Sequence, residues 1–93
     1  MKIYQSGSFE RKVKKFNKNE KSSLDNEIKK IIRDPSVGVE KKGDLKGVFV
    51  HKFKIKPALY LLSYRFVADG IELITIGFHE NYYRNLKSYL KKR

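Results

Sequence analysis

The sequence predicts one α+β domain over residues 1–93, in which an antiparallel sheet carries helices on one face. The first half contains two stretches with apolar residues at helical spacing, and the second half contains three stretches that alternate at period two. Short turns join the three alternating stretches, which indicates hairpins and therefore an antiparallel sheet. The expected order is β-α-α-β-β-β-α, with a helical hairpin on one face and a C-terminal helix.

A short strand over residues 2–6, "KIYQS", is expected to open the chain. The first helix follows in "GSFERKVKKF". Ser8 is the expected N-cap, and Glu10 lies in the first turn, where the helix dipole favours a carboxylate. Three apolar residues share one face of this helix: Phe9, Val13 and Phe16.

The second helix is expected over residues 20–33, after the break at "NKN". It stops at Asp34, because the residue before Pro35 avoids helical backbone angles. Its apolar stripe consists of Leu24, Ile28, Ile31 and Ile32. The stretch "SVGVEKKGDLKG" that follows is predicted to be a polar loop, since glycines interrupt it.

Three strands are then expected at residues 47–55, 59–67 and 71–78. Lys56-Pro57 turns the first into the second, and "ADG" is a hairpin signal between the second and the third. The last element is a helix over residues 80–92. Its apolar stripe consists of Tyr83, Leu86 and Leu90.

The charge of the chain is its most informative bulk property. Lys and Arg number 22 and Asp and Glu number 10, which gives a net charge of +12. Such an excess attracts polyanions, so nucleic acid or an acidic protein is the expected partner. The chain has no cysteine, which excludes disulfides and thiolate metal sites. Neither a membrane span nor a signal peptide is visible, and a cytoplasmic location is expected.

The strand "GVFVHKFKIK" has two unlike faces. One face carries Phe49, His51, Phe53 and Ile55, and the helices are expected to cover it, with His51 in a structural role. Lys52, Lys54 and Lys56 then lie on the opposite, open face. The next strand alternates in the same way: Tyr60, Leu62, Tyr64 and Phe66 are expected in the core. Arg65 would share the open face with the lysines. Lysines can also simply solvate an exposed face and protect it from edge pairing.

The stretches "GDLKGVFVHKFKIKPALYLLSYR" and "IELITIGFHENYY" resemble the RelE/ParE superfamily, the toxins of bacterial type II toxin–antitoxin systems. The resemblance covers nearly the whole chain in element order. It implies a ribosome-dependent, metal-independent mRNA endonuclease that inhibits translation, with an antitoxin protein and mRNA on the 70S ribosome as partners and no cofactor. The alternative is a ParE-like toxin that blocks DNA gyrase without nuclease activity. A plain RNA-binding domain is less well supported, because the open face has few aromatic residues.

The resemblance also implies the site residues. The expected catalytic residues are Lys52, Lys54, His79 and Tyr83, and the expected RNA-binding residues are Lys46, Lys56, Arg65 and Arg84. RelE has arginine where this chain has Leu61 and His79; Arg65 is the candidate substitute for the first of these.

Proton transfer by His79 is chemically reasonable, since an imidazole titrates near neutral pH. A helix cap or a packing residue is the alternative for His79. Tyr83 also fits the apolar stripe of the last helix, which leaves Tyr82 as the second candidate. Two histidines without cysteine make a metal site improbable.

Overall fold

The computed structural model describes residues 2–78 and residue 90. Its helices and strands are β1 (Lys2–Gln5), α1 (Gly7–Val13), α2 (Lys18–Arg33), β2 (Val39–Glu40), β3 (Val48–Ile55), β4 (Ala58–Val67) and β5 (Gly70–Phe78), with short 3-10 turns η1 (Pro35–Val37) and η2 (Gly43–Leu45) on either side of β2. The expected final helix over residues 80–92 lies outside the described residues apart from Leu90.

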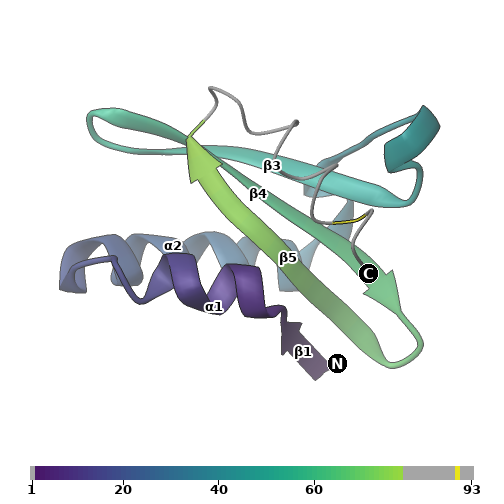
Figure 1. The fold of residues 1–93 in the computed structure, drawn as a ribbon, viewed down its shortest axis with the longest axis horizontal. Coiled ribbons are helices and arrows are strands. Elements are labelled where there is room, and N and C mark those ends of the chain that lie inside the picture. Colours follow the sequence, from purple (N-terminus) through teal and green to yellow (C-terminus); the bar gives the residue numbers. More distant parts are fainter. Residues whose placement is uncertain (1, 79–89, 91–93) are drawn as a thin grey trace.

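The described residues form a sheet of five strands in the order β1-β5-β4-β3-β2 (Figure 1). The hairpins β3–β4 and β4–β5 are antiparallel, as predicted. The expectation of a wholly antiparallel sheet is wrong at one edge, where β1 runs parallel to β5 and Lys2 lies opposite Gly70. Turn signals specify only strands that are neighbours in sequence, and β1 pairs with the last strand. The sheet is therefore mixed.

Helix α1 begins earlier than expected, and its cap is a different serine. The Ser6 hydroxyl accepts a hydrogen bond from the Phe9 amide, so Ser6 is the N-cap. Ser8, the predicted cap, lies within the helix, and its hydroxyl bonds to that of Thr75 on β5 at 2.9 Å. With this start, Phe9 lies in the first turn of α1 and is buried in the main core.

Helix α2 begins two residues before its predicted start. Asn17 and Glu20 form a capping box, in which each side chain accepts a hydrogen bond from the other residue's backbone amide. The helix ends at Arg33, as the Asp34-Pro35 pair predicts. None of the described helices is long and apolar enough to cross a membrane.

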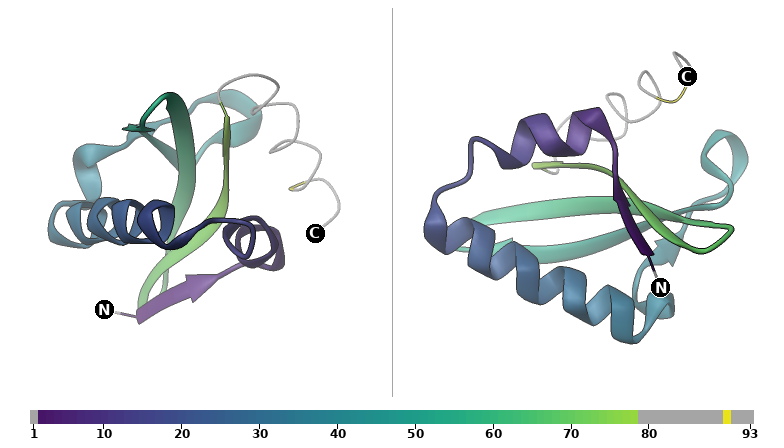
Figure 2. Two further views of the ribbon diagram at one scale, coloured as in Figure 1. Left: turned by 90° about the vertical axis from the view of Figure 1, so that its left-hand side faces the viewer. Right: turned by 90° about the horizontal axis from the view of Figure 1, so that it is seen from below.

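Both helices lie on the same face of the sheet (Figure 2). The side chains between them and the sheet form the main core, and the predicted core residues of β4 are confirmed except for Phe66, which is 48% exposed. The buried members are Phe9, Leu24, Ile31, Phe53, Tyr60, Leu62, Tyr64, Ile71, Leu73 and Ile76.

The opposite face is not open along its whole length, contrary to the expectation. It carries a second buried cluster of Leu45, Val48, Val50, Leu61 and Ile74, and Leu90 packs against it. A β-bulge interrupts the pairing of β4 with β5 between Ser63 and Tyr64, and β5 has one extra residue at this point. Ile74 is that residue and joins the second cluster, whereas its neighbour Leu73 belongs to the main core.

Candidate functional site

Lys52 and Lys54 lie on the face of β3 that points away from the helices. Both side chains are exposed. Their neighbours across the hairpin are Leu61 and Leu59, respectively. Residues two apart on a strand are separated by about 6.5–7 Å along it, so two long side chains can converge on one phosphate or on neighbouring phosphates. Lys56 is also exposed, in the turn beyond the end of β3.

Arg65 lies on the same face but at the other end of the sheet. It stands opposite Val48, four residues along β4 from Leu61, which corresponds to about 13 Å. Its Nε donates a hydrogen bond to the Glu72 carboxylate at 2.7 Å. The structure therefore does not bring Arg65 together with the lysines. Leu61, which lies opposite Lys52 on β4, is fully buried in the second cluster.

His51 lies on the helix-covered face, in agreement with a structural role. Its Nε2 is 2.7 Å from Glu27 Oε1 on α2, and its ring stacks on Phe53 with 5.7 Å between centroids. Burial alone would raise the pKa of Glu27. The hydrogen bonds from His51 and Lys30 outweigh burial, so the pKa of Glu27 is lowered. The pair fastens α2 to β3.

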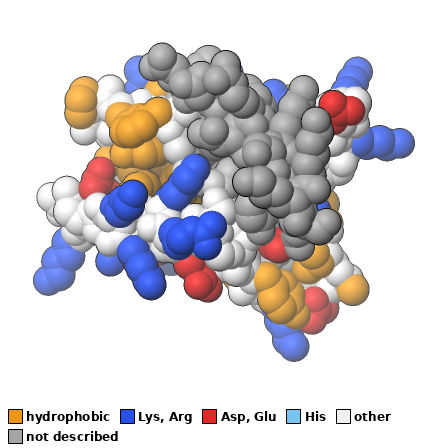
Figure 3. Space-filling model, in the orientation of Figure 1, with side chains coloured by type: hydrophobic (Ala, Val, Ile, Leu, Met, Phe, Trp, Pro, Cys, Tyr) orange, Lys and Arg blue, Asp and Glu red, His pale blue; other side chains and the backbone are white. Residues whose placement is uncertain are grey.

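The end of the sheet that carries the lysines is also where β5 ends. Phe78 is 59% exposed and stacks on Tyr60, with 5.0 Å between ring centroids. Exposed hydrophobic side chains gather at this end, near the β3–β4 hairpin (upper left in Figure 3). His79 directly follows Phe78 in sequence. The expected site residues His79, Tyr83 and Arg84 lie outside the described residues.

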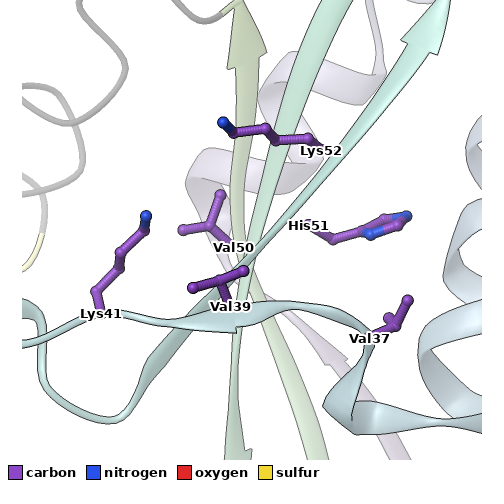
Figure 4. A pocket seen from close by; sticks show the side chains of 6 residues that line it. All are labelled: Val37, Val39, Lys41, Val50, His51 and Lys52. Atoms are coloured by element: carbon purple, nitrogen blue, oxygen red, sulfur yellow. The ribbon is translucent and has the colours of Figure 1, made fainter.

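A groove beside Lys52 was not predicted from the sequence. It has a volume of about 450 Å³, and its lining comes from η1, β2, β3 and the residue after β2 (Figure 4). The lining residues are Val37, Val39, Lys41, Val50, His51 and Lys52. The only signal in the sequence is the alternation of "VGVEK", which lies within the stretch that the glycines predict to be a loop.

Lys46 lies in a second, smaller hollow on the loop between β2 and β3. This hollow has a volume of about 280 Å³ and shares Lys41 with the groove. Its lining consists of Glu40, Lys41, Lys42, Gly43 and Lys46. The loop is held closed by Glu40, whose carboxylate accepts a hydrogen bond from the Gly47 amide at 3.3 Å. Within residues 2–78 and at residue 90, no group of three or more potential metal ligands is found.

A family model described as the ParE-like toxin of type II bacterial toxin–antitoxin systems matches residues 3–87. No curated protein shows a significant match. Among solved structures, the chain is similar to the Escherichia coli RelE toxin in two crystal structures. In the intact RelBE toxin–antitoxin complex, the TM-score is 0.65 at 15% identity, with 84% of this chain and 95% of that chain covered. For isolated RelE the TM-score is 0.62, again at 15% identity, with coverages of 92% and 95%.

A third similar structure is the solution structure of the conserved hypothetical protein HP0894 from Helicobacter pylori. Its identity is 26% and its TM-score 0.48, with 85% of this chain and 94% of that chain covered. The two RelE structures show that the present chain has a RelE-like fold.

Proposed function

The chain belongs to the ParE-like toxin family of type II bacterial toxin–antitoxin systems, and on that premise we propose that it is a ribosome-dependent, metal-independent mRNA endonuclease that inhibits translation. One observation carries the proposal. Lys52 and Lys54 are exposed side by side on one face of β3, at the end of the sheet where β5 leads into His79. All 93 residues act as one toxin domain in this proposal.

The proposed reaction uses the RNA's own nucleophile. The ribose 2′-oxygen attacks the adjacent phosphorus, the bond from phosphorus to the 5′-oxygen breaks, and the products are a 2′,3′-cyclic phosphate and a 5′-hydroxyl. One group must take the 2′-hydroxyl proton and another must give a proton to the leaving oxygen. His79 is assigned one of these proton transfers because an imidazole titrates near neutral pH. Tyr83 is assigned the orientation of the ribose or the stacking of a base.

The two lysines are assigned the phosphate. Negative charge grows on its oxygens as the fifth bond forms, and ammonium groups fixed nearby stabilise that charge more in the transition state than in the ground state. Lys52 and Lys54 suit this task because both project from one rigid strand. Lys46, Lys56 and Arg84 are assigned further contacts with the RNA backbone. Arg65 has a weaker claim, since Glu72 already neutralises it.

Inhibition of DNA gyrase without nuclease activity is the second candidate. The matching family model is ParE-like, and the resemblance seen in the sequence implies gyrase inhibition as the alternative activity. The structure adds one observation in its favour. The position at which RelE has arginine beside the lysines is the fully buried Leu61.

An antitoxin is the proposed protein partner. RelE itself is found with an antitoxin in the RelBE complex, and the +12 charge of the present chain suits an acidic segment that becomes ordered on binding. Normal growth of cells that strongly express the intact chain alone would argue against a toxin.

The nuclease is tested by primer extension on mRNA in a translating extract, with purified protein added or omitted. The nuclease proposal expects new cuts with the parental chain and none with His79→Ala, provided that the variant retains its far-UV circular dichroism. A gyrase supercoiling assay on the same preparations covers the second candidate. Inhibited supercoiling without mRNA cuts would replace the first proposal by the second.

A further inference from the structure

The groove between β2 and β3 has no role in the proposed cleavage chemistry. We propose that it is a nucleotide subsite beside the cleavage site, in which the exposed Val39 packs against one RNA base and Lys41 contacts a phosphate of the same strand. The inference rests on the proposed nuclease function and extends it, because it names the part of the chain that holds the RNA next to the cut.

The register of the strands places four of the six residues that line the groove on the same face as the proposed cleavage site. Val39 lies opposite Val50, and the Lys41 amide donates to the Val48 carbonyl, so Lys41 continues the pairing of β2 with β3. Paired residues share a face of a sheet, as do residues two apart on a strand. Val39, Lys41, Val50 and Lys52 therefore point to one side, and Figure 4 shows His51 on the other side of β3.

The groove combines an apolar floor with a cation near each end. Val39 is 64% exposed, the largest exposed fraction of any large hydrophobic residue described, and Val50 beneath the groove is 3% exposed. Lys41 and Lys52 contribute the cationic ends (Figure 4). A nucleotide has the matching chemistry, since it carries a flat apolar base and an anionic phosphate. Contact with a base would explain why the hydrophobic side chain of Val39 is exposed.

The backbone edge of β3 next to the groove continues past the last residue that β2 pairs with. The Val48 carbonyl faces β2, so every second residue from it, including Lys52 and Lys54, directs its backbone groups to the same edge. Strand β2 begins at Val39, opposite Val50. No strand among the described residues covers the edge from Lys52 to Ile55. A base seated on Val39 lies next to this edge, where amide and carbonyl groups can form hydrogen bonds with its polar atoms.

An added peptide strand, such as a segment of an antitoxin, is the competing occupant. The uncovered edge Lys52–Ile55 spans half of the eight residues of β3, which is short for strand addition, since strands typically have about five or six residues. The groove is also continuous with the exposed lysines of β3, because Lys52 lines it, so an RNA strand held by these lysines can extend into it. These two features favour RNA.

The first test places a cross-linker in the groove. The chain has no cysteine, so Val39→Cys creates a unique thiol for a benzophenone maleimide. The matched control is Ser22→Cys on the exposed surface of α2. Irradiation on programmed ribosomes is expected to cross-link the groove variant to mRNA within a few nucleotides of the cut, and the control at other positions or not at all. Equal cross-linking of the two variants to mRNA, or cross-links of the groove variant to added antitoxin only, would overturn the subsite.

The second test removes the phosphate contact. Lys41→Ala is expected to raise the ribosome concentration needed for half-maximal cleavage by about three- to tenfold, and to reduce the salt dependence of binding by about one ion. Lys41→Arg keeps the charge and should restore both values. The control is Lys29→Ala, which removes an exposed charge from α2. Identical values for the alanine variants at positions 41 and 29 would refute the contact. A parental chain that does not cut mRNA would refute the nuclease itself, whereas cutting without these effects refutes only the subsite.

Discussion

The two faces of the sheet are built differently. The helix-covered face is apolar along most of β3, β4 and β5, and the core between it and the helices has ten buried residues, seven from these strands and three from the helices. The opposite face changes character along one strand: Val48 and Val50 are each 3% exposed, whereas Lys52 and Lys54, on the same face of β3, are exposed. The comparison teaches that one face of a single strand can serve as core over half its length and as an exposed, positively charged surface over the rest.

The first prediction tests whether both faces are true core. Leu62 on the helix-covered face and Leu61 on the opposite face are adjacent on β4, and both are fully buried. Leu62→Ala is expected to lower the free energy of unfolding by about 2–5 kcal/mol, and Leu61→Ala by an amount in the lower part of that range, because its cluster is smaller. Urea unfolding measures both. A loss below about 1 kcal/mol for Leu61→Ala would mean that the second cluster is not core.

The second prediction concerns the cationic half of the opposite face. Lys52→Ala and Lys54→Ala should each slow single-turnover cleavage on programmed ribosomes by about tenfold to a thousandfold, because each removes a charge that stabilises the transition state. Their free energies of unfolding should stay within about 0.5 kcal/mol of the parental value, since both side chains are exposed. Lys56→Ala should have a smaller effect on the rate, because Lys56 lies beyond the end of β3. If the lysines only solvate the face, all three variants will cut at near-parental rates.

The third prediction concerns how Tyr64, on the helix-covered face, holds η1, the turn just before β2. The Tyr64 hydroxyl donates to the Pro35 carbonyl at 2.6 Å and accepts from the Gly38 amide at 3.0 Å. Burial raises the pKa of Tyr64, so the hydroxyl stays protonated at neutral pH. Tyr64→Phe should lower the free energy of unfolding by about 1–3 kcal/mol, because the buried Gly38 amide loses its acceptor. Thermal unfolding of the two proteins at equal concentration measures the loss, and unchanged midpoints would contradict it.

The smallest expected effect is the pH dependence of the contact between Glu27 and His51. The pKa of Glu27 is lowered in the folded chain. A lowered carboxyl pKa contributes stability above the unfolded value of about 4.3, and this contribution is lost as pH falls through the folded pKa. The parental chain should therefore lose stability below about pH 4.3 more steeply than Glu27→Gln. Urea unfolding at pH 7, 5, 4 and 3 gives the comparison; parallel curves for the two proteins would contradict it.

The local signals in the sequence predicted most of the fold correctly. The end of α2 at Asp34 and the three long strands follow from a proline and from period-two alternation. Strand β2 was missed because two residues are too short to show a period. The parallel pairing of β1 was missed because it depends on contacts with the far end of the chain.

The candidate site was predicted only in part. The exposure of Lys52 and Lys54 followed from alternation. The buried role of Val48 and Val50 did not, because alternation separates two faces without showing what covers them. The neutralisation of Arg65 by Glu72 was within reach, since the hairpin at "ADG" places the two residues opposite each other. Lys41 was missed together with the strand that positions it.

The parallel pairing of β1 has a consequence for the order in which the fold can be completed. A ribosome makes β1 first, and its only described partner strand, β5, is made 68 positions later, as the contact between Ser6 and Ile74 illustrates. Gly70 lies so close to the Lys2 backbone that any side chain there would collide with it. Contacts between such distant parts of a chain form slowly. A translation product that ends before Gly70 lacks the strand that β1 pairs with among the described residues, so this pairing forms only after β5 has been synthesised.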